Sequence, residues 1–324
     1  MIEVKHLTKR YGKNIAVKDL SFTVEDNEVY GFLGPNGAGK STTMNIMTGY
    51  LSTDEGEVLI NGHSIFEEPE TVKAMIGYLP EQPPLYTDMT AYEYLMFVAD
   101  LKKVAKDEKK AQIEKAMERT GVTDVKDRLI KNLSKGYRQR VGFAEALIGN
   151  PSVIILDEPT VGLDPAQIIE IRSLIRELGK EHTVILSSHI LSEVSSVCDK
   201  VLIISKGELV ACDTAENLEK NVFGGNTYTI EVKGSEEEVK KVLQGIKGIE
   251  FSKAQGGDPA YSRFEIKSKE SEDISDKLFY AFAEARMPLK TLEKKSASLE
   301  DVFLEVTGNE PEKETSGKKK GDKK

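Results

Sequence analysis

The stretch GPNGAGKS, residues 34–41, has residue types and a spacing suited to binding phosphate. It matches the pattern G-x-x-x-x-G-K-[ST] and follows VYGFL, an apolar run that predicts a strand. Glycines let successive backbone N–H groups turn toward phosphate oxygens, and the helix expected after the loop adds its positive end. We therefore expect Lys40 to reach the β- and γ-phosphates of a nucleotide and Ser41 to ligate Mg²⁺. The alternative is a glycine-rich turn with a chance lysine.

Two adjacent carboxylates, Asp157 and Glu158, follow the apolar run VIIL. Seen alone, such a pair is often a solvated turn at a strand end. Beside a phosphate-binding loop, Asp157 is expected to support Mg²⁺ directly or through water. Glu158 is then placed to polarise the water that attacks the γ-phosphate.

Gln82 and His189 also follow expected strands, in IGYLPEQ and VILSSH. Taken singly, each is as well explained as a structural residue. Their order along the chain relative to LSKG, LDE and GLDP makes them candidates for the same site.

The composition indicates a globular protein without a membrane span. Hydrophobic residues make up 39% and charged residues 31%, and no apolar run approaches the ~18 residues that a span needs. The first residues lack the apolar segment of a signal peptide. The two cysteines fit no metal or disulfide framework. We expect a cytoplasmic protein, and the net charge of −9 argues against nucleic acid as a partner.

Residues 1–218 alternate short apolar runs with helical patterns, which predicts a layered α/β domain. Continuous apolar runs indicate strands buried on both faces; these are EVYGFLG, AMIGYLPE, SVIILDEPT, TVILSSH and KVLIISKG. Residues from Thr90 to Arg119 predict two helices, with the capping-box pair Thr90 and Glu93 at the start and Gly121 as the stop. The helical subdomain is expected at about 83–145.

The rest of the chain predicts a second, smaller domain. Residues 219–226, EKNVFGGN, are expected to be a linker, and 227–308 read as strand, helix, strand, helix, a small α+β accessory domain. Residues 309–324 carry six lysines against three glutamates and one aspartate. They predict a disordered charged tail, or one that touches anionic lipid.

The ordered set of motifs resembles the ATP-binding subunit of an ABC transporter, over about residues 1–214. The motifs are Walker A (Gly34–Ser41), the Q-loop (Gln82), the signature (Leu133–Gly136), Walker B (Val153–Glu158), the D-loop (Gly162–Asp164) and the switch histidine (His189). The resemblance implies an α/β fold: a P-loop NTPase core of the ABC ATPase type with an antiparallel β subdomain and a helical insertion.

The resemblance also implies ATP and Mg²⁺ as cofactors and assigns roles to residues. The implied ATP-binding residues are Tyr11, which would meet the adenine, and Gly34, Pro35, Asn36, Gly37, Ala38, Gly39, Lys40, Ser41 and Thr42. The implied catalytic residues are Glu158, His189 and Gln82, and the implied metal ligands are Ser41, Gln82 and Asp157.

The stretch NLSKGYRQR, residues 132–140, is expected to act in trans. In the family, two subunits sandwich two ATP molecules, so Ser134, Lys135 and Gly136 would bind the γ-phosphate of ATP held by the other subunit. Asp164 is the implied site residue of the D-loop. The usual pattern is Leu-Ser-Gly-Gly-Gln, from which this chain departs at Lys135 and Tyr137. A plain capped helix start is the alternative.

The resemblance further implies separately encoded transmembrane permease subunits and a second nucleotide-binding subunit, either this chain or a paralogue. The protein would lie peripherally on the inner face of the cell membrane. The ending SASLEDVFLEVTG and the stretch GYLPEQPPLY are similar to ATPases of bacterial exporters for drugs, lipids or ions, including the gliding-motility type. Residues 227–308 could instead be a regulatory or dimer-stabilising module.

Two other functions compete with this interpretation. One is an ABC ATPase that acts on ribosomes or DNA, but such proteins usually carry two Walker A motifs or long coiled coils, and this chain has one GKS and no sustained heptads. The other is a nucleotide-binding regulator that does not hydrolyse ATP, against which Glu158 and His189 argue.

Overall fold

The computed structural model describes residues 1–223, 227–254, 256, 258, 260–268, 273–295 and 298–308. It separates the chain into two compact units, Met1–Leu218 and a second that begins at Glu219. Helix α8 (Ala215–Phe223) runs through that boundary, so the first residues of the expected linker are helical. Residues 224–226 and the expected tail, 309–324, lie outside the described residues.

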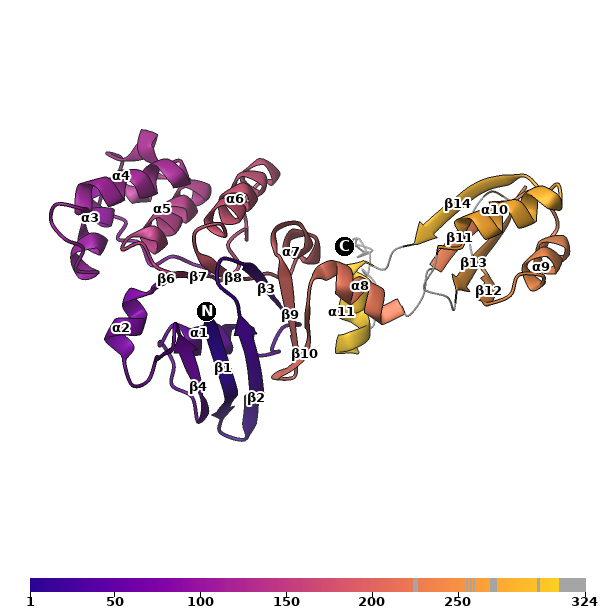
Figure 1. Ribbon diagram of the computed structural model, residues 1–324. Helices are drawn as coiled ribbons and strands as arrows, with labels where there is room; N and C mark the ends of the chain where they lie inside the picture. The colour runs from indigo at the N-terminus through magenta and orange to yellow at the C-terminus, as the bar shows by residue number, and fades with distance from the viewer. Residues whose placement is uncertain are drawn as a thin grey trace, which may run out of the picture. The chain divides into compact units, whose positions relative to one another are not determined.

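The central sheet of the first unit has six strands in the order β10-β9-β3-β8-β7-β6 (Figure 1). They are β3 (Val29–Leu33), β6 (Ile76–Leu79), β7 (Val153–Leu156), β8 (Thr183–Ser187), β9 (Lys200–Ser205) and β10 (Glu208–Asp213). The strands from β9 to β6 are parallel, and β10 pairs antiparallel with β9. Every residue of β3, β7 and β8 is buried, which confirms the prediction from the apolar runs.

The two faces of this sheet pack against different elements. On one face, Met44 of α1 (Lys40–Met47) shares a core with Phe32 and Ile155 of the central strands. On the other face, α7 (Leu191–Val197) comes so close that a Cβ at Gly31 would lie 2.2 Å from the Val194 side chain. Helix α6 (Pro165–Leu178) packs beside α7 and against β8. This layering leaves the carboxyl-terminal edge of the sheet for the loops that carry the motifs.

A second, antiparallel sheet completes the core of the first unit, in the order β2-β1-β4-β5. Its strands are β1 (Ile2–Tyr11), β2 (Asn14–Val24), β4 (Glu55–Ile60) and β5 (His63–Ser64), and α2 (Pro69–Ala74) follows. Buried side chains from its strands, such as Leu7, Val17 and Val58, join the same core as α1. This is the antiparallel β subdomain that the family resemblance implied.

The helical insertion (purple to magenta in Figure 1) has its own apolar core. It comprises α3 (Ala91–Leu101), α4 (Lys109–Thr120), two 3-10 turns (Thr123–Val125 and Ile130–Asn132) and α5 (Lys135–Leu147). Thr90 and Glu93 form the expected reciprocal capping box at the start of α3. Gly121 ends α4 at φ 66°, in the left-handed conformation that glycine adopts readily. Both sequence predictions are therefore confirmed.

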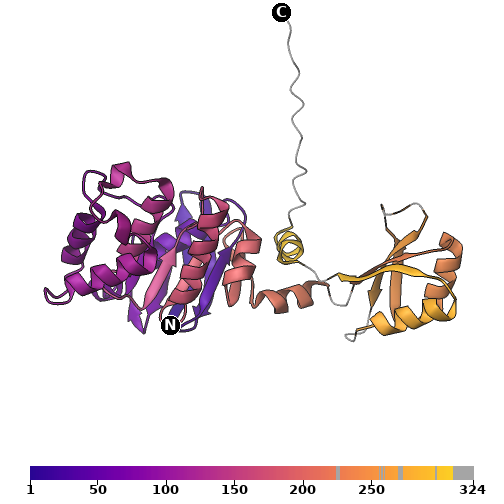
Figure 2. The same cartoon turned by 90° about the horizontal axis from the view of Figure 1, so that it is seen from above.

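The second unit is a four-stranded antiparallel sheet in the order β12-β13-β11-β14. Its elements are β11 (Thr227–Val232), α9 (Glu236–Gln244), β12 (Ile249–Lys253), β13 (Ser262–Ser268), α10 (Ser275–Glu284) and β14 (Leu289–Lys295), followed by α11 (Leu299–Thr307). Helices α9 and α10 cover one face of the sheet (Figure 2). There, Leu243 and Phe282 share a core with Ile230 and Phe264. The sequence reading missed the edge strands β12 and β14.

No helix in the described ranges combines the length and the apolar character that crossing a bilayer would need.

Candidate functional site

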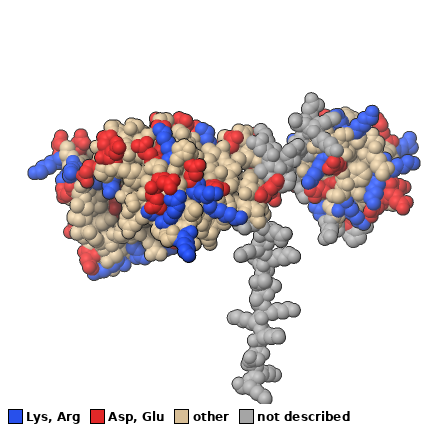
Figure 3. Space-filling view, turned by 90° about the horizontal axis from the view of Figure 1, so that it is seen from below, with Lys and Arg blue, Asp and Glu red and all other residues tan. Residues whose placement is uncertain are grey.

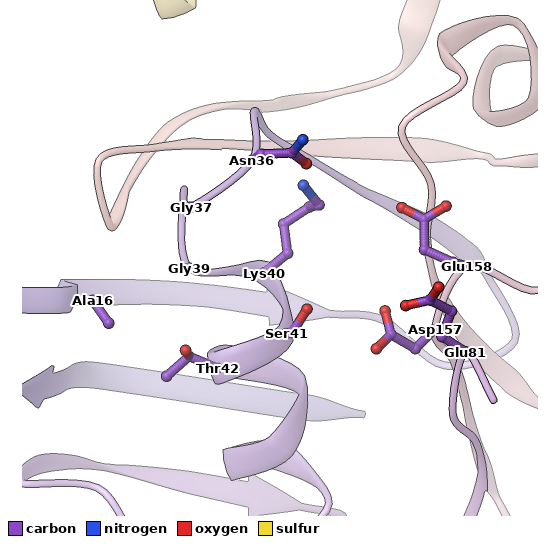
Figure 4. Close-up of a pocket in the computed structure, with 10 residues that line it drawn as sticks. All are labelled: Ala16, Asn36, Gly37, Gly39, Lys40, Ser41, Thr42, Glu81, Asp157 and Glu158. Carbon is purple, nitrogen blue, oxygen red and sulfur yellow. The ribbon is translucent and has the colours of Figure 1, made fainter. Parts of the chain in front are cut away.

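A cavity of about 370 Å³ opens at the carboxyl-terminal edge of the central sheet (Figure 4). It is lined by Ala16, Asn36, Gly37, Gly39, Lys40, Ser41, Thr42, Glu81, Asp157 and Glu158. These residues come from β2, from the loop between β3 and α1, from the first turn of α1, and from the segments that follow β6 and β7. The fold therefore joins the phosphate-binding loop and the carboxylate pair, which lie more than a hundred residues apart.

The shape of the loop depends on glycine at its last position before α1. Gly39 has a φ of 105°, and a Cβ there would lie 2.4 Å from the carbonyl oxygen of Ala16. No other residue fits without displacing β2, because that carbonyl belongs to the backbone. The first N–H groups of α1 consequently face the cavity, which is the arrangement that binds anions.

Lys40 lies over the loop and points into the cavity (Figure 4). Its ammonium donates to the carbonyl oxygen of Gly34 and, at 3.3 Å, to that of Pro35. Burial lowers the pKa of Lys40, while the charges of Glu158 and Asp157 oppose that shift. The ammonium is thus partly removed from water and can exchange carbonyl partners for phosphate oxygens.

The carboxylate pair is held by a serine at the end of β8. The Ser187 hydroxyl donates to Asp157 Oδ1 at 2.6 Å and accepts from the Glu158 N–H at 2.9 Å. One hydroxyl therefore fixes both neighbours, and Asp157 and Glu158 share a cavity with the Ser41 hydroxyl (Figure 4). Hydroxyl and carboxylate oxygens are the ligands that Mg²⁺ prefers, so these residues fit a Mg²⁺–phosphate site.

His189 extends the site beyond the cavity lining. Its Nδ1 lies 2.8 Å from Glu158 Oε2, and its side chain is 58% exposed. Glu158 itself is only 15% exposed and has a φ of 48°, a left-handed conformation that is uncommon outside glycine. The structure therefore brings together two of the three residues that the resemblance implied to be catalytic.

Glu81, and not Gln82, lines the cavity next to Asp157 and Glu158 (Figure 4). Gln82 lines a different hollow, together with Tyr50, Lys102 and Glu145. A carboxylate thus stands where an amide was expected from the motif order. Sequence reasoning missed Glu81 because both residues are polar and follow the same strand.

Two of the expected ATP-binding residues that do not line the cavity, Ala38 and Pro35, stabilise the loop through backbone hydrogen bonds. The Ala38 N–H donates to the Pro35 carbonyl at 3.1 Å, and the Ala38 carbonyl accepts from Gly207 at 3.0 Å. Tyr11, the residue expected to meet adenine, ends β1 and is 51% exposed. It lies on the same hairpin as Ala16 but does not line the cavity.

The signature lies apart from this cavity, since Ser134, Lys135 and Gly136 are not among its lining residues. Ser134 caps α5, with its hydroxyl accepting from the Tyr137 N–H at 3.3 Å. A Cβ at Gly136 would lie 2.5 Å from the Gln167 amide, so a larger residue there would have to displace the Gln167 side chain.

The same region joins the signature to the D-loop within one chain. Asp164 caps α6, accepting from the Gln167 N–H at 2.9 Å. The Lys135 ammonium lies against Gly162, since a Cβ placed on that glycine would be 2.0 Å from it. The lysine that replaces the family's first signature glycine therefore packs on the D-loop.

A glycine loop that turns onto a helix N-terminus, facing carboxylates that follow another parallel strand of the same sheet, defines a P-loop nucleotide-hydrolysing protein. A family profile described as "ABC transporter" matches residues 17–161. The chain is 37% identical to the uncharacterized ABC transporter ATP-binding protein YhcH of Bacillus subtilis, over 96% of this chain and 97% of that protein. It is 31% identical to the linearmycin resistance ATP-binding protein LnrL of the same organism, over 95% of this chain and 98% of that protein.

Among solved structures, the chain is similar to a dimer of the ATP-binding cassette MJ0796, in a post-hydrolysis state bound to ADP and Pi. The TM-score is 0.60 at 25% identity, covering 66% of this chain and 98% of that one. The chain belongs to the ATP-binding proteins of ABC transporters, and it is an ATPase.

Because Glu81 lines the cavity, we expect it to support the Mg²⁺–phosphate site. Glu81→Ala should therefore lower ATP hydrolysis by about tenfold, which is the loss typical for a residue that supports a metal site. Gln82→Ala, the neighbouring control, should cost less because its side chain lines another hollow. Steady-state ATP hydrolysis by both variants measures the difference. A larger loss in Gln82→Ala would contradict the role of Glu81.

Proposed function

We propose that this chain is the ATPase subunit of an exporter, working as a dimer that closes around two ATP molecules. The single observation that carries the proposal is the separation of the signature from the cavity of its own chain. A signature that serves no ATP in cis requires a second subunit, either another copy or a paralogue. The dimeric MJ0796 cassette supports this arrangement, and similarity to a linearmycin resistance protein over the whole chain supports export.

Each site would hydrolyse ATP with groups from both subunits. Lys40 and the N–H groups of α1 bind the β- and γ-phosphates, and Glu158 orients a water against the γ-phosphorus. The water oxygen bonds to phosphorus as the bond to the bridging oxygen of ADP breaks, and Glu158 accepts the water's proton. His189, in contact with Glu158, stabilises the γ-phosphate. Ser134, Lys135 and Gly136 of the second subunit complete the phosphate's surroundings, with Asp164 beside them.

We propose that Ser41 and Asp157 hold Mg²⁺ with the phosphates, and that Glu81 supplies the contact expected of Gln82. Mg²⁺ would neutralise charge on the phosphates. Within the described residues, no group of three or more His, Cys, Asp or Glu could hold a metal ion on its own. Magnesium is commonly bound by one or two carboxylates plus substrate phosphates, which agrees with this donor set. Tyr11 would contact adenine from its exposed position on the first hairpin.

The partner of the ATPase would be a separately encoded transmembrane permease, which would bring the protein to the inner face of the membrane. A hollow of about 540 Å³, here called the docking groove, is lined by Asn45, Tyr50, Ile76, Tyr78, Pro80, Gln82, Pro84, Lys102 and Glu145. Tyr50 is 84% exposed at its rim, and such an aromatic suits a protein contact. On the face drawn in Figure 3, acidic and basic side chains are interspersed, which does not favour nucleic acid.

Polar groups form the floor of the docking groove. The Lys102 ammonium donates to the carbonyl oxygens of Glu145 at 3.2 Å and Ile148 at 2.8 Å. Tyr94 donates its hydroxyl to the Glu145 carboxylate at 2.7 Å. Burial lowers the pKa of Lys102 to about 8 and raises that of Glu145. We therefore expect the docking segment to be largely apolar, with a polar side chain that reaches these groups.

Glu158→Gln should bind ATP but hydrolyse it ~100-fold or more slowly, because the amide cannot accept the proton. Charge repulsion with the γ-phosphate is also removed, so the variant should accumulate as an ATP-bound dimer. ATP turnover and size-exclusion chromatography with ATP measure the two effects. Turnover close to that of the unmodified chain would exclude Glu158 as the catalytic carboxylate.

Mixing two defective variants tests whether the signature acts in trans. One tagged chain carries Ser134→Arg and another carries Lys40→Ala, both in the Glu158→Gln background. Either variant alone forms two defective sites, whereas the mixed dimer has one intact Walker A facing one intact signature. ATP-dependent pull-down of one tag by the other should appear only in the mixture.

The control for mixing is the Glu158→Gln parent, which must first associate with itself in ATP. If that parent dimerises and mixing rescues nothing, Ser134 serves the ATP of its own chain. If the parent stays monomeric at saturating ATP, self-association is excluded and the second subunit is a different chain.

Tyr50→Arg should impair binding to washed membranes of the protein's own host while changing ATP hydrolysis by less than about twofold, because Tyr50 lies outside the ATP cavity. Tyr280→Arg is the matched control, since Tyr280 is 63% exposed on α10 of the second unit. Co-sedimentation measures the binding. Equal binding by both variants would put the docking surface elsewhere.

A further inference from the structure

A buried carboxylate contacts the two loops that carry Glu158 and His189, and it has no role in the steps of ATP hydrolysis described so far. Glu193, on α7, is 5% exposed. A buried charge is costly unless hydrogen bonds and an opposite charge compensate it. The groups that contact the Glu193 carboxylate therefore indicate which parts of the fold it holds together.

Both loops bond to the same oxygen of Glu193. Oε2 accepts from the Thr160 hydroxyl at 2.6 Å and from the Ser188 hydroxyl at 3.4 Å. Thr160 follows Glu158 by two residues, and Ser188 directly precedes His189. Both hydroxyl-bearing residues are buried, at 5% and 1% exposure. One carboxylate oxygen thus joins the loop after β7 to the loop after β8.

The other oxygen faces the helix that begins at the D-loop. Glu193 Oε1 lies 3.4 Å from Arg172 of α6, whose side chain is 30% exposed. This cation offsets the buried charge and adds α6 to the same cluster. The Ser188 hydroxyl also accepts from the Ile190 N–H at 3.0 Å, which closes the turn that carries His189.

We propose that Glu193 is a positioning residue for ATP hydrolysis. By holding Thr160 and Ser188 on one oxygen, it maintains the 2.8 Å contact between His189 and Glu158. Glu158 needs such support, since its φ of 48° is a conformation that persists only where the surroundings fix it. Glu193 does not itself line the cavity, so it would act on the site through these two loops.

The first test separates turnover from binding. Glu193→Ala in the full chain should lower kcat by about tenfold to a hundredfold, because small misplacements of catalytic groups cost that much. The dissociation constant for ATP should stay within about twofold, since the phosphate-binding loop is untouched. Glu193→Gln, which keeps an acceptor oxygen, and Thr160→Val, which removes one hydroxyl, should each lose less. If Glu193→Ala does not fold, these two milder variants test the proposal in its place.

The second test asks whether Glu193 acts through His189. In the His189→Ala background, Glu193→Ala should lower kcat by less than about twofold more, because the contact it maintains is already absent. If Glu193 were purely structural, Glu193→Ala would lower kcat by the same factor in the His189→Ala background as in the unmodified chain.

His182→Ala is the control for loss of a buried polar group. His182 is 3% exposed, its Nδ1 donates to the Pro151 carbonyl at 2.7 Å, and it is outside the catalytic cluster. We expect a lower Tm with unchanged kcat. The proposal is overturned if Glu193→Ala behaves like this control, if ATP affinity falls in parallel with kcat, or if its effect adds fully to that of His189→Ala.

Discussion

Parallel strands end at the same edge of a sheet, and this constraint governs the whole site. β3, β6, β7 and β8 are adjacent in space but scattered along the chain. Because their carboxyl ends coincide, a phosphate-binding loop, three carboxylates and a histidine meet without any local sequence relationship. The buried apolar strands thus stabilise the fold and set the catalytic geometry at once.

The electrostatics of the cavity follow from that convergence. Glu81, Asp157 and Glu158 place three carboxylates around one space, opposed in the lining by Lys40. Such a site repels a bare polyphosphate and accepts one whose charge a divalent cation has reduced. The Ser187 hydroxyl holds Asp157, and Glu193 holds Thr160 in the loop that follows Glu158, so both stabilise this arrangement of like charges. Hydroxyl groups of Ser187 and Thr160 and the ion pair between Glu193 and Arg172 therefore act together in ordering the site.

Much of this was predictable from sequence, and the failures have physical causes. The continuous apolar runs predicted the buried strands, and the cap residues Thr90 and Gly121 predicted helix ends, because these signals are local. β12 and β14 were missed because edge strands need little apolar alternation; three of the five residues of β12 are exposed and none is buried, and β14 is rich in lysine. Which of Glu81 and Gln82 faces the cavity depends on how the chain turns after β6, and no local pattern specifies that.

Helix α5 has the signature serine at its first turn and the Lys102 ammonium bonded to carbonyls near its end. Thirteen residues make a rod about 20 Å long. Its buried face packs in the core of the helical insertion, so the helix and that core form one packed body. A tilt of about 10° about one end would move the other by roughly 3.5 Å, from the ~1.5 Å rise per residue. If the proposed docking groove and the signature act as we propose, this helix would link them, because a shift at one of its ends displaces the other.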